Sequence, residues 1–248
     1  MSRKTFAVGA MILMISSCGV IGGDDNTADT ATPTTDARPG LEEDKAAAQA
    51  ALLTLADFPA GWSEVPAEDE TDEDGARELA KCVGSDGDSF IEVGDAEAST
   101  GDFKDPEENV TISEGVGIAV TMDEAAAALA ALEEPGVTAC IQDAFRAVIT
   151  DRIANPPTPA DSLPEGASVG EVTFGRLNVA PIGDQLVAYR VTIPISVEAL
   201  AIDFFIDIVL ARQGRSIASV QFESVLEPYA TEELDRIVAL AVSRLPDQ

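Results

Sequence analysis

Histidine is absent from this 248-residue sequence, and only three cysteines are present. The absence of histidine excludes a Ser-His-Asp triad, the commonest general base, and the imidazole ligands that usually hold zinc or copper. The sequence also lacks a P-loop, a dinucleotide-binding glycine fingerprint and the G-x-S-x-G motif of many hydrolases. We therefore predict no catalytic residue, no metal site and no cofactor.

Basic residues are scarce as well. Lysine and arginine together number 15, against 45 aspartates and glutamates, and the formal net charge is −30. Nucleic-acid binding depends on the neutralisation of phosphates by basic side chains, so a nucleic-acid partner is excluded. Anionic lipid headgroups would repel the chain for the same reason. The simplest role of this charge is to keep the protein soluble, and a specific cationic partner is the less favoured interpretation.

Long hydrophobic runs are also missing, since a membrane-spanning helix takes roughly 20 apolar residues. The run Phe6–Ile15 has ten residues and follows the positive charges of Arg3 and Lys4. A short apolar run after a positive segment is typical of a signal peptide. We predict that residues 1–17 are a signal peptide that is removed on export.

The sequence Ile15-Ser16-Ser17-Cys18 ends this segment. An aliphatic residue, two small residues and a cysteine resemble the lipobox of bacterial lipoproteins. The resemblance implies that Cys18 is lipidated, that the chain is cut just before it and that the new amino group is acylated. Two or three acyl chains would hold the protein at the outer face of the cell membrane, because each buried methylene contributes ~0.8 kcal/mol. The alternative is an ordinary signal peptide followed by a chance cysteine.

Residues 18–43 are rich in threonine, aspartate and proline and contain few large apolar side chains. Such a segment cannot bury enough surface to offset the entropy that is lost on ordering. We predict a flexible tether that joins the lipid to a single extracytoplasmic domain at residues 44–248. The threonines of the tether could carry sugars, and a bare linker is the alternative.

Two cysteines remain if Cys18 carries lipid. Outside the cytoplasm, Cys82 and Cys140 most simply form a disulfide, and the alternative is two free thiols. A bridge that closes a loop of this length would stabilise the fold by about 4 kcal/mol in the chain-entropy model. The pair lacks the C-x-x-C spacing of redox sites, which argues against a redox role.

Hydrophobic periodicity and breaker residues place the secondary structure. The predicted helices are Asp44–Ala56, Ala76–Val83, a segment capped by Thr121 or Asp123 that ends at Leu132, Val137–Ile153, and a last helix capped by Thr231 that ends at Leu245. The predicted strands are Val110–Val120, one that starts at Val172 and Phe174, Val187–Ile195, Phe204–Ala211 and Ile217–Val225. The last two flank a hairpin turn at residues 212–215. This order predicts an α+β fold with one antiparallel sheet of three or four late strands and helices packed on at least one face.

Several of these features occur together in one family. The lipobox, the Thr-rich stalk, Pro59–Trp62, the helices around Cys82 and Cys140 and the final strand-hairpin-helix resemble secreted actinobacterial lipoproteins. Their domain is similar to the extracellular sensor domain of mycobacterial serine/threonine kinases, the PknH-like family, over residues 45–245. That family usually has two disulfides, whereas only one pair is available here. The related PsbP/Mog1-like lipoprotein fold is the alternative. Both imply a groove between sheet and helices, and neither implies a known reaction.

The family resemblance suggests a non-catalytic domain that binds or senses a cell-envelope ligand. The ligand, an envelope lipid or glycan, is expected on a sheet face lined by Tyr189, Val191 and Phe222, near Trp62. The competing interpretation is that these four side chains fill the core. A module that recruits a protein partner and a carboxylate-based hydrolase are the alternative functions. The acidic stretch Glu70–Gly75 imitates the start of an EF-hand, but position twelve is a lysine, so no calcium site is predicted.

Overall fold

The computed structural model describes residues 40–66, 80–82, 96–107, 109–154, 167–197 and 200–246. The predicted signal peptide, Cys18 and the tether up to residue 39 lie outside these residues. The same holds for the acidic stretch Glu70–Gly75, for most of the predicted helix Ala76–Val83 and for the proline-rich segment 155–166.

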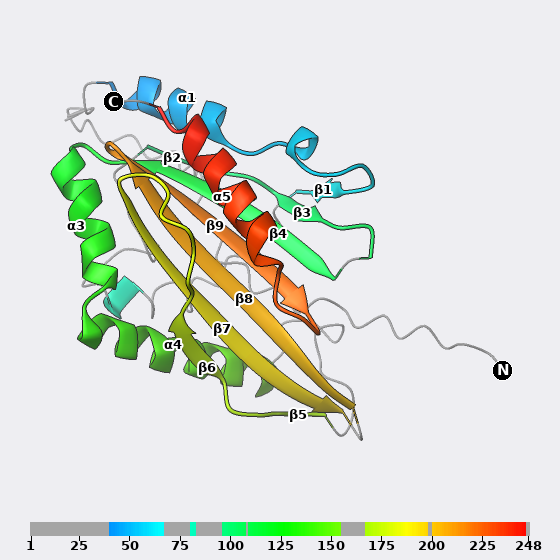
Figure 1. Cartoon of the computed structure of the whole chain (residues 1–248). Coiled ribbons are helices and arrows are strands. Elements are labelled where there is room, and N and C mark those ends of the chain that lie inside the picture. The colour runs from blue at the N-terminus through cyan, green and yellow to red at the C-terminus, as the bar shows by residue number, and fades with distance from the viewer. Residues whose placement is uncertain are drawn as a thin grey trace, which may run out of the picture.

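A single antiparallel sheet forms the centre of the domain, which confirms the predicted fold class (Figure 1). Its order is β1-β3-β4-β9-β8-β7-β5, with β2 also paired to β4 and β6 also paired to β7. The strands are β1 (Ser63–Val65), β2 (Ala96–Ser99), β3 (Asp102–Lys104), β4 (Val110–Ile118), β5 (Ala167–Val169), β6 (Thr173–Arg176), β7 (Gln185–Val197), β8 (Leu200–Gln213) and β9 (Ser216–Val225). The sheet has nine strands in the described part, more than the five predicted, because strands of three or four residues show no periodic signal.

The long strands β7, β8 and β9 pair antiparallel in this order, and the alternating apolar residues of Val187–Ile195 predicted the first of them. The β8–β9 hairpin turns at Gly214, whose φ of 60° lies in the left-handed region that glycine adopts without a steric penalty. The predicted hairpin is therefore confirmed. Both of its strands are longer than predicted, and β8 carries Asp203 and Asp207 within its apolar run.

Helices cover both faces of the sheet (Figure 1). Helices α1 (Leu41–Ala51) and α5 (Thr231–Arg244) pack on one face, here called the α1/α5 face. Helices α3 (Met122–Leu132) and α4 (Pro135–Ala154) pack on the opposite α3/α4 face. Because side chains alternate along a strand, each long strand contributes to both cores: Ala188 and Val209 to the first, Val187 and Leu210 to the second.

The helix ends match the sequence signals only in part. Thr121 caps α3, since its hydroxyl accepts a hydrogen bond from the Glu124 N–H at 3.1 Å, as predicted. The first helix is shifted toward the N-terminus: it starts at Leu41 and ends at Ala51, and a short 3₁₀ helix, η1 (Leu55–Asp57), follows. The last helix begins at Thr231 with Ala230 as its cap, so Thr231 does not have the capping role that we predicted.

Candidate functional site

The four residues predicted to line a ligand site do not share one face. Tyr189 and Val191 are 3% and 0% exposed and lie in the core of the α3/α4 face. The Tyr189 hydroxyl donates to the Leu132 carbonyl at 2.5 Å, which ties β7 to the end of α3. Phe222 and Trp62 belong to the core of the α1/α5 face. The prediction that the four residues form one lining is wrong. The strand register pairs Phe222 with Asp207 and Asp207 with Arg190, which lies between Tyr189 and Val191 in β7. Phe222 therefore shares a sheet face with Arg190 and not with those two residues.

A row of directly paired residues crosses the α1/α5 face from β3 to β7. It runs through Phe103 in β3, Ile112 in β4, Phe222 in β9, Asp207 in β8 and Arg190 in β7. The three apolar members are at most 1% exposed. The row is therefore apolar at one side of the sheet and charged at the other, and we call it the cross-sheet row.

Aromatic rings extend the apolar side of the cross-sheet row toward solvent. Phe58 contacts Phe103 with ring centroids 4.5 Å apart, and Trp62 stacks on Phe58 at 4.8 Å. Tyr229 stacks on Phe222 at 5.2 Å. Trp62 and Tyr229 are both half-buried, so each has one side against the core and one side toward solvent. Burial, followed by the charge of Glu233, raises the pKa of the Tyr229 hydroxyl, which keeps it an uncharged hydrogen-bonding group.

The charged side of the cross-sheet row is a bidentate ion pair. Arg190 donates to both carboxylate oxygens of Asp207, at 2.5 Å and 2.6 Å. The Asp207 side chain is 1% exposed, whereas that of Arg190 is 26% exposed and passes over the Phe205 ring at 5.8 Å. The hydrogen bond to Asp207 raises the pKa of Arg190. The arginine therefore screens a buried carboxylate and keeps part of its own surface open.

Sequence reasoning did not select Arg190 or Asp207. The available signal was a charged residue inside each of two apolar strands, and a buried charge in a strand needs a partner. Which arginine pairs with which aspartate depends on register, and register depends on the turn between β7 and β8. The sequence alone does not supply it.

A second group of charges lies where the segment after α1 crosses β4. Glu114 in β4 is 3% exposed, and its Oε2 accepts a hydrogen bond from the Leu53 N–H at 2.5 Å. Burial raises the pKa of Glu114 to about 7, and the charge of Asp57 acts in the same direction. The Leu53 hydrogen bond and the charge of Arg244 oppose that shift but do not cancel it.

Asp57 shows the opposite behaviour. Burial favours its neutral form, but hydrogen bonds from the Thr54 N–H and hydroxyl and the nearby Arg244 outweigh that effect and lower the pKa of Asp57. Arg244, at the end of α5, donates to Asp57 at 2.5 Å and to the Leu52 carbonyl at 2.8 Å. This cluster therefore holds one carboxyl group that resists ionisation and one that favours it.

No group of three or more histidine, cysteine, aspartate or glutamate side chains in the described part is arranged to hold a metal ion. No helix within the described ranges is both long and apolar enough to cross a membrane.

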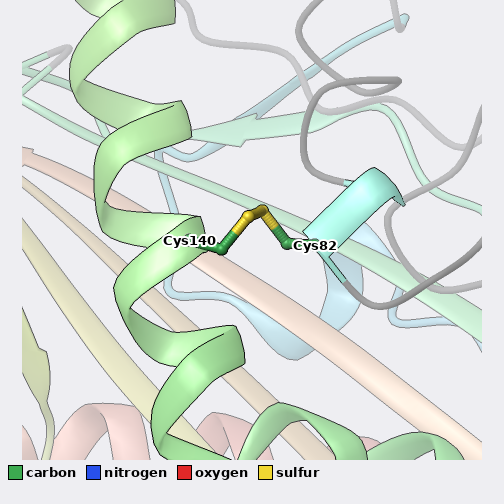
Figure 2. The surroundings of a disulfide bond; sticks show 2 residues. All are labelled: Cys82 and Cys140. Atoms are coloured by element: carbon green, nitrogen blue, oxygen red, sulfur yellow. A yellow bond between two sulfur atoms is a disulfide. The ribbon is translucent and has the colours of Figure 1, made fainter.

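The predicted disulfide between Cys82 and Cys140 is present (Figure 2). Cys140 projects from α4, and Cys82 lies at the end of the helical stretch of residues 80–82. Their Cα atoms are 5.5 Å apart, inside the range of 4.4–6.8 Å that disulfides require. The bond fixes a distant part of the chain against the helix that covers the α3/α4 face.

These features define an antiparallel α+β domain with helices on both faces and one disulfide. No protein-family model and no curated protein matches the chain. Among solved structures, it is similar to the crystal structure of the extracellular domain of PknH from Mycobacterium tuberculosis. That similarity has a TM-score of 0.39 at 11% sequence identity, and it covers 79% of this chain and 93% of that chain.

Proposed function

We propose that this chain is an exported lipoprotein whose domain binds or senses a ligand of the cell envelope without catalysis. The lipobox at Cys18 and the disulfide support the extracytoplasmic location, and a surface on the α1/α5 face supports the binding function. The observation that carries the binding surface is the pair of half-buried rings, Trp62 and Tyr229, at the apolar side of the cross-sheet row.

The disulfide supports the extracytoplasmic location of the domain. Disulfides persist in oxidising compartments and are rare in the cytosol, where thiols are kept reduced. The bond between Cys82 and Cys140 is therefore consistent with export past the membrane. It leaves Cys18 as the remaining cysteine of the three, available for lipid.

The binding surface takes its properties from the cross-sheet row. Trp62 and Tyr229 offer flat apolar faces with a polar group at the rim, and such rings contribute strongly to recognition. Arg190 adds hydrogen-bond donors, of which part remains open beside Phe205. Stacking rings next to a neutralised ion pair suit an uncharged, partly apolar molecule, as a glycan or lipid of the envelope would be.

The anchor is tested by the variant Cys18→Ala in the full chain. We expect the protein to leave the detergent phase in phase partitioning or to accumulate as an uncut precursor, because the acyl chains have lost their attachment point. Ser17→Ala keeps a small residue before the cysteine and is the matched control, which should partition like the wild type. Unchanged partitioning of the Cys18→Ala protein would contradict the anchor.

The binding surface is tested through Trp62, which as the only tryptophan reports its own surroundings in fluorescence. We expect its emission to shift with purified envelope glycan or lipid fractions, and we expect Tyr229→Ala to reduce that response. Phe174→Leu, on the α3/α4 face, is the control and should leave it unchanged. Flat emission across the panel would count against the ligand and favour recruitment of a protein partner.

One observation favours the hydrolase alternative, and it concerns Glu114 and Asp57. Two carboxyl groups with pKa values displaced in opposite directions are the arrangement that acid–base catalysis uses. Catalysis also needs the acid to reach a substrate. Glu114 is 3% exposed, is bound to Leu53 and is flanked by core residues. The pair therefore supports a structural role more strongly than a catalytic one.

A further inference from the structure

The carboxyl group of Glu114 occupies an unusual position for an acid. It projects from β4 toward the α1/α5 face between Ile112 and Val116, which are 0% and 1% exposed. Its Oε2 has the Leu53 N–H as partner, whereas its Oε1 has no partner among the residues that the structure describes. A carboxylate anion in such surroundings is strongly disfavoured relative to the neutral acid, because it loses hydration without full compensation.

The charged groups around Glu114 come from two elements. Asp57 reaches toward it from η1 and Arg244 from α5. Arg244 is already bound to Asp57 and to the Leu52 carbonyl, so its positive charge is shared with another carboxylate. The net effect is that no arginine is dedicated to Glu114 in the described structure.

The remaining neighbours of Glu114 among the described residues carry no charge. Its cross-strand partner in β9 is Val220. On the side of β2, the Thr100 hydroxyl accepts from the Glu114 N–H at 3.0 Å, which involves the backbone and not the carboxyl group. Helix α1 has its acidic residues in the first turn and no basic residue in the last turn, the end nearer to Glu114.

We propose that Glu114 makes the docking of the end of α1 onto the sheet dependent on pH. As a neutral acid, Glu114 accepts the hydrogen bond from the Leu53 N–H, and residues 52–57 pack against β4. As an anion, it requires water or a counter-ion, and the segment that covers it must open to supply either one.

The direction of the effect follows from the pKa of Glu114, which burial raises from 4.5 to about 7. A state in which the segment is open has the ordinary pKa and releases its proton first. Docking is therefore strongest below pH 4.5, weakens as the pH rises from 4.5 to 7 and stays weak above 7. Helix α1 starts at Leu41, inside the segment 18–43 that was predicted to be tether, and its 11 residues join the proposed anchor side of the chain to the loosened residues 52–57. That connection rests on the anchor, whereas the pH dependence does not.

Hydrogen exchange of the full chain tests this proposal. Protection of the amides of residues 52–57, corrected for the intrinsic pH dependence of exchange, should fall by about tenfold or more between about pH 5.5 and about pH 8. The Leu53 amide should show the largest change, since it donates directly to Glu114. Amides of α3 and α4 should not follow this trend.

The variant Glu114→Gln keeps the shape but cannot ionise, so its protection should not change with pH in this way. Glu64→Gln, at an exposed position in β1, is the matched control and should retain the wild-type behaviour. A carbon NMR titration of the Glu114 carboxyl group in the wild type provides a measurement that does not depend on any variant. Equal pH profiles for the wild type and Glu114→Gln would overturn the proposal, as would a carboxyl midpoint at the ordinary value of 4.5.

Discussion

Different interactions hold the covering elements on the two faces of the sheet. On the α3/α4 face, aliphatic and aromatic side chains pack under two helices, and a disulfide holds one of those helices. On the α1/α5 face, charged groups tie the covering elements together: Asp44 to Arg215, Asp57 to Arg244, and Glu114 beneath the end of α1. The first face should therefore respond to reductant and the second to pH.

On the α1/α5 face, the contributions of Asp57 and Glu114 to stability depend on pH in opposite directions. The pKa of Asp57 is lowered, so its contribution to stability is present above its ordinary pKa of 3.8 and is lost as the pH falls below that value. The pKa of Glu114 is raised, so its unfavourable contribution grows as the pH rises from 4.5 to about 7. Together they place the greatest stability of this face in the mildly acidic range.

Loss of the disulfide should have the largest effect on the free energy of unfolding. The double variant Cys82→Ala, Cys140→Ala should lose about 4 kcal/mol of unfolding free energy, because the bond constrains the unfolded chain across a separation of 58 residues. The loss should be nearly the same at pH 5 and pH 8, since no titrating group is removed. Urea denaturation at both pH values measures it.

Reductant supplies the control for that prediction. It should lower the stability of the wild type and leave the double variant unchanged. If reductant leaves the wild type unchanged as well, the bond does not contribute to stability, and the two faces do not differ in the way described.

Much of the fold follows from local pattern. The period of two over Val187–Ile195 predicted β7, and Gly214 between two apolar runs predicted the β8–β9 hairpin. The Cys82–Cys140 bond followed from an even cysteine count and an exported address. The short strands β1, β2, β3 and β5 could not be predicted, because three or four residues contain too few repeats to reveal a period.

The candidate site depended on information that local pattern does not contain. Tyr189 and Phe222 both lie in predicted strands. The sequence of one strand does not show whether its residues lie on the same sheet face as a given residue of another strand. Only the register of β7 with β8 and of β8 with β9 separates them. Glu114 was missed for a related reason: it is one acid among 45, and its burial depends on α1, which precedes it by about sixty residues.

A smaller effect, confined to the α1/α5 face, is expected from Asp44. This aspartate in α1 is 4% exposed, and Arg215 from the β8–β9 turn donates to both of its carboxylate oxygens, at 2.8 Å and 2.5 Å. Asp44→Ala should cost about 3 kcal/mol, because it leaves a largely buried guanidinium without its counter-charge. Glu42→Ala is the matched control in the same helix turn: its side chain is 87% exposed, so the change should stay within about 0.5 kcal/mol.

A double-mutant cycle decides whether the cost of Asp44→Ala comes from the pair itself. Arg215→Met keeps the apolar stem and removes the charge, so adding it to Asp44→Ala should restore part of the lost stability. Part of the cost should persist, because Arg215 also donates to the Ala119 carbonyl at 3.0 Å. If the two single changes instead add without coupling, the ion pair does not hold α1 to the β8–β9 turn. Apolar packing, the Asp57–Arg244 ion pair and the hydrogen bond from the Leu53 N–H to Glu114 would then hold the covering elements of the α1/α5 face.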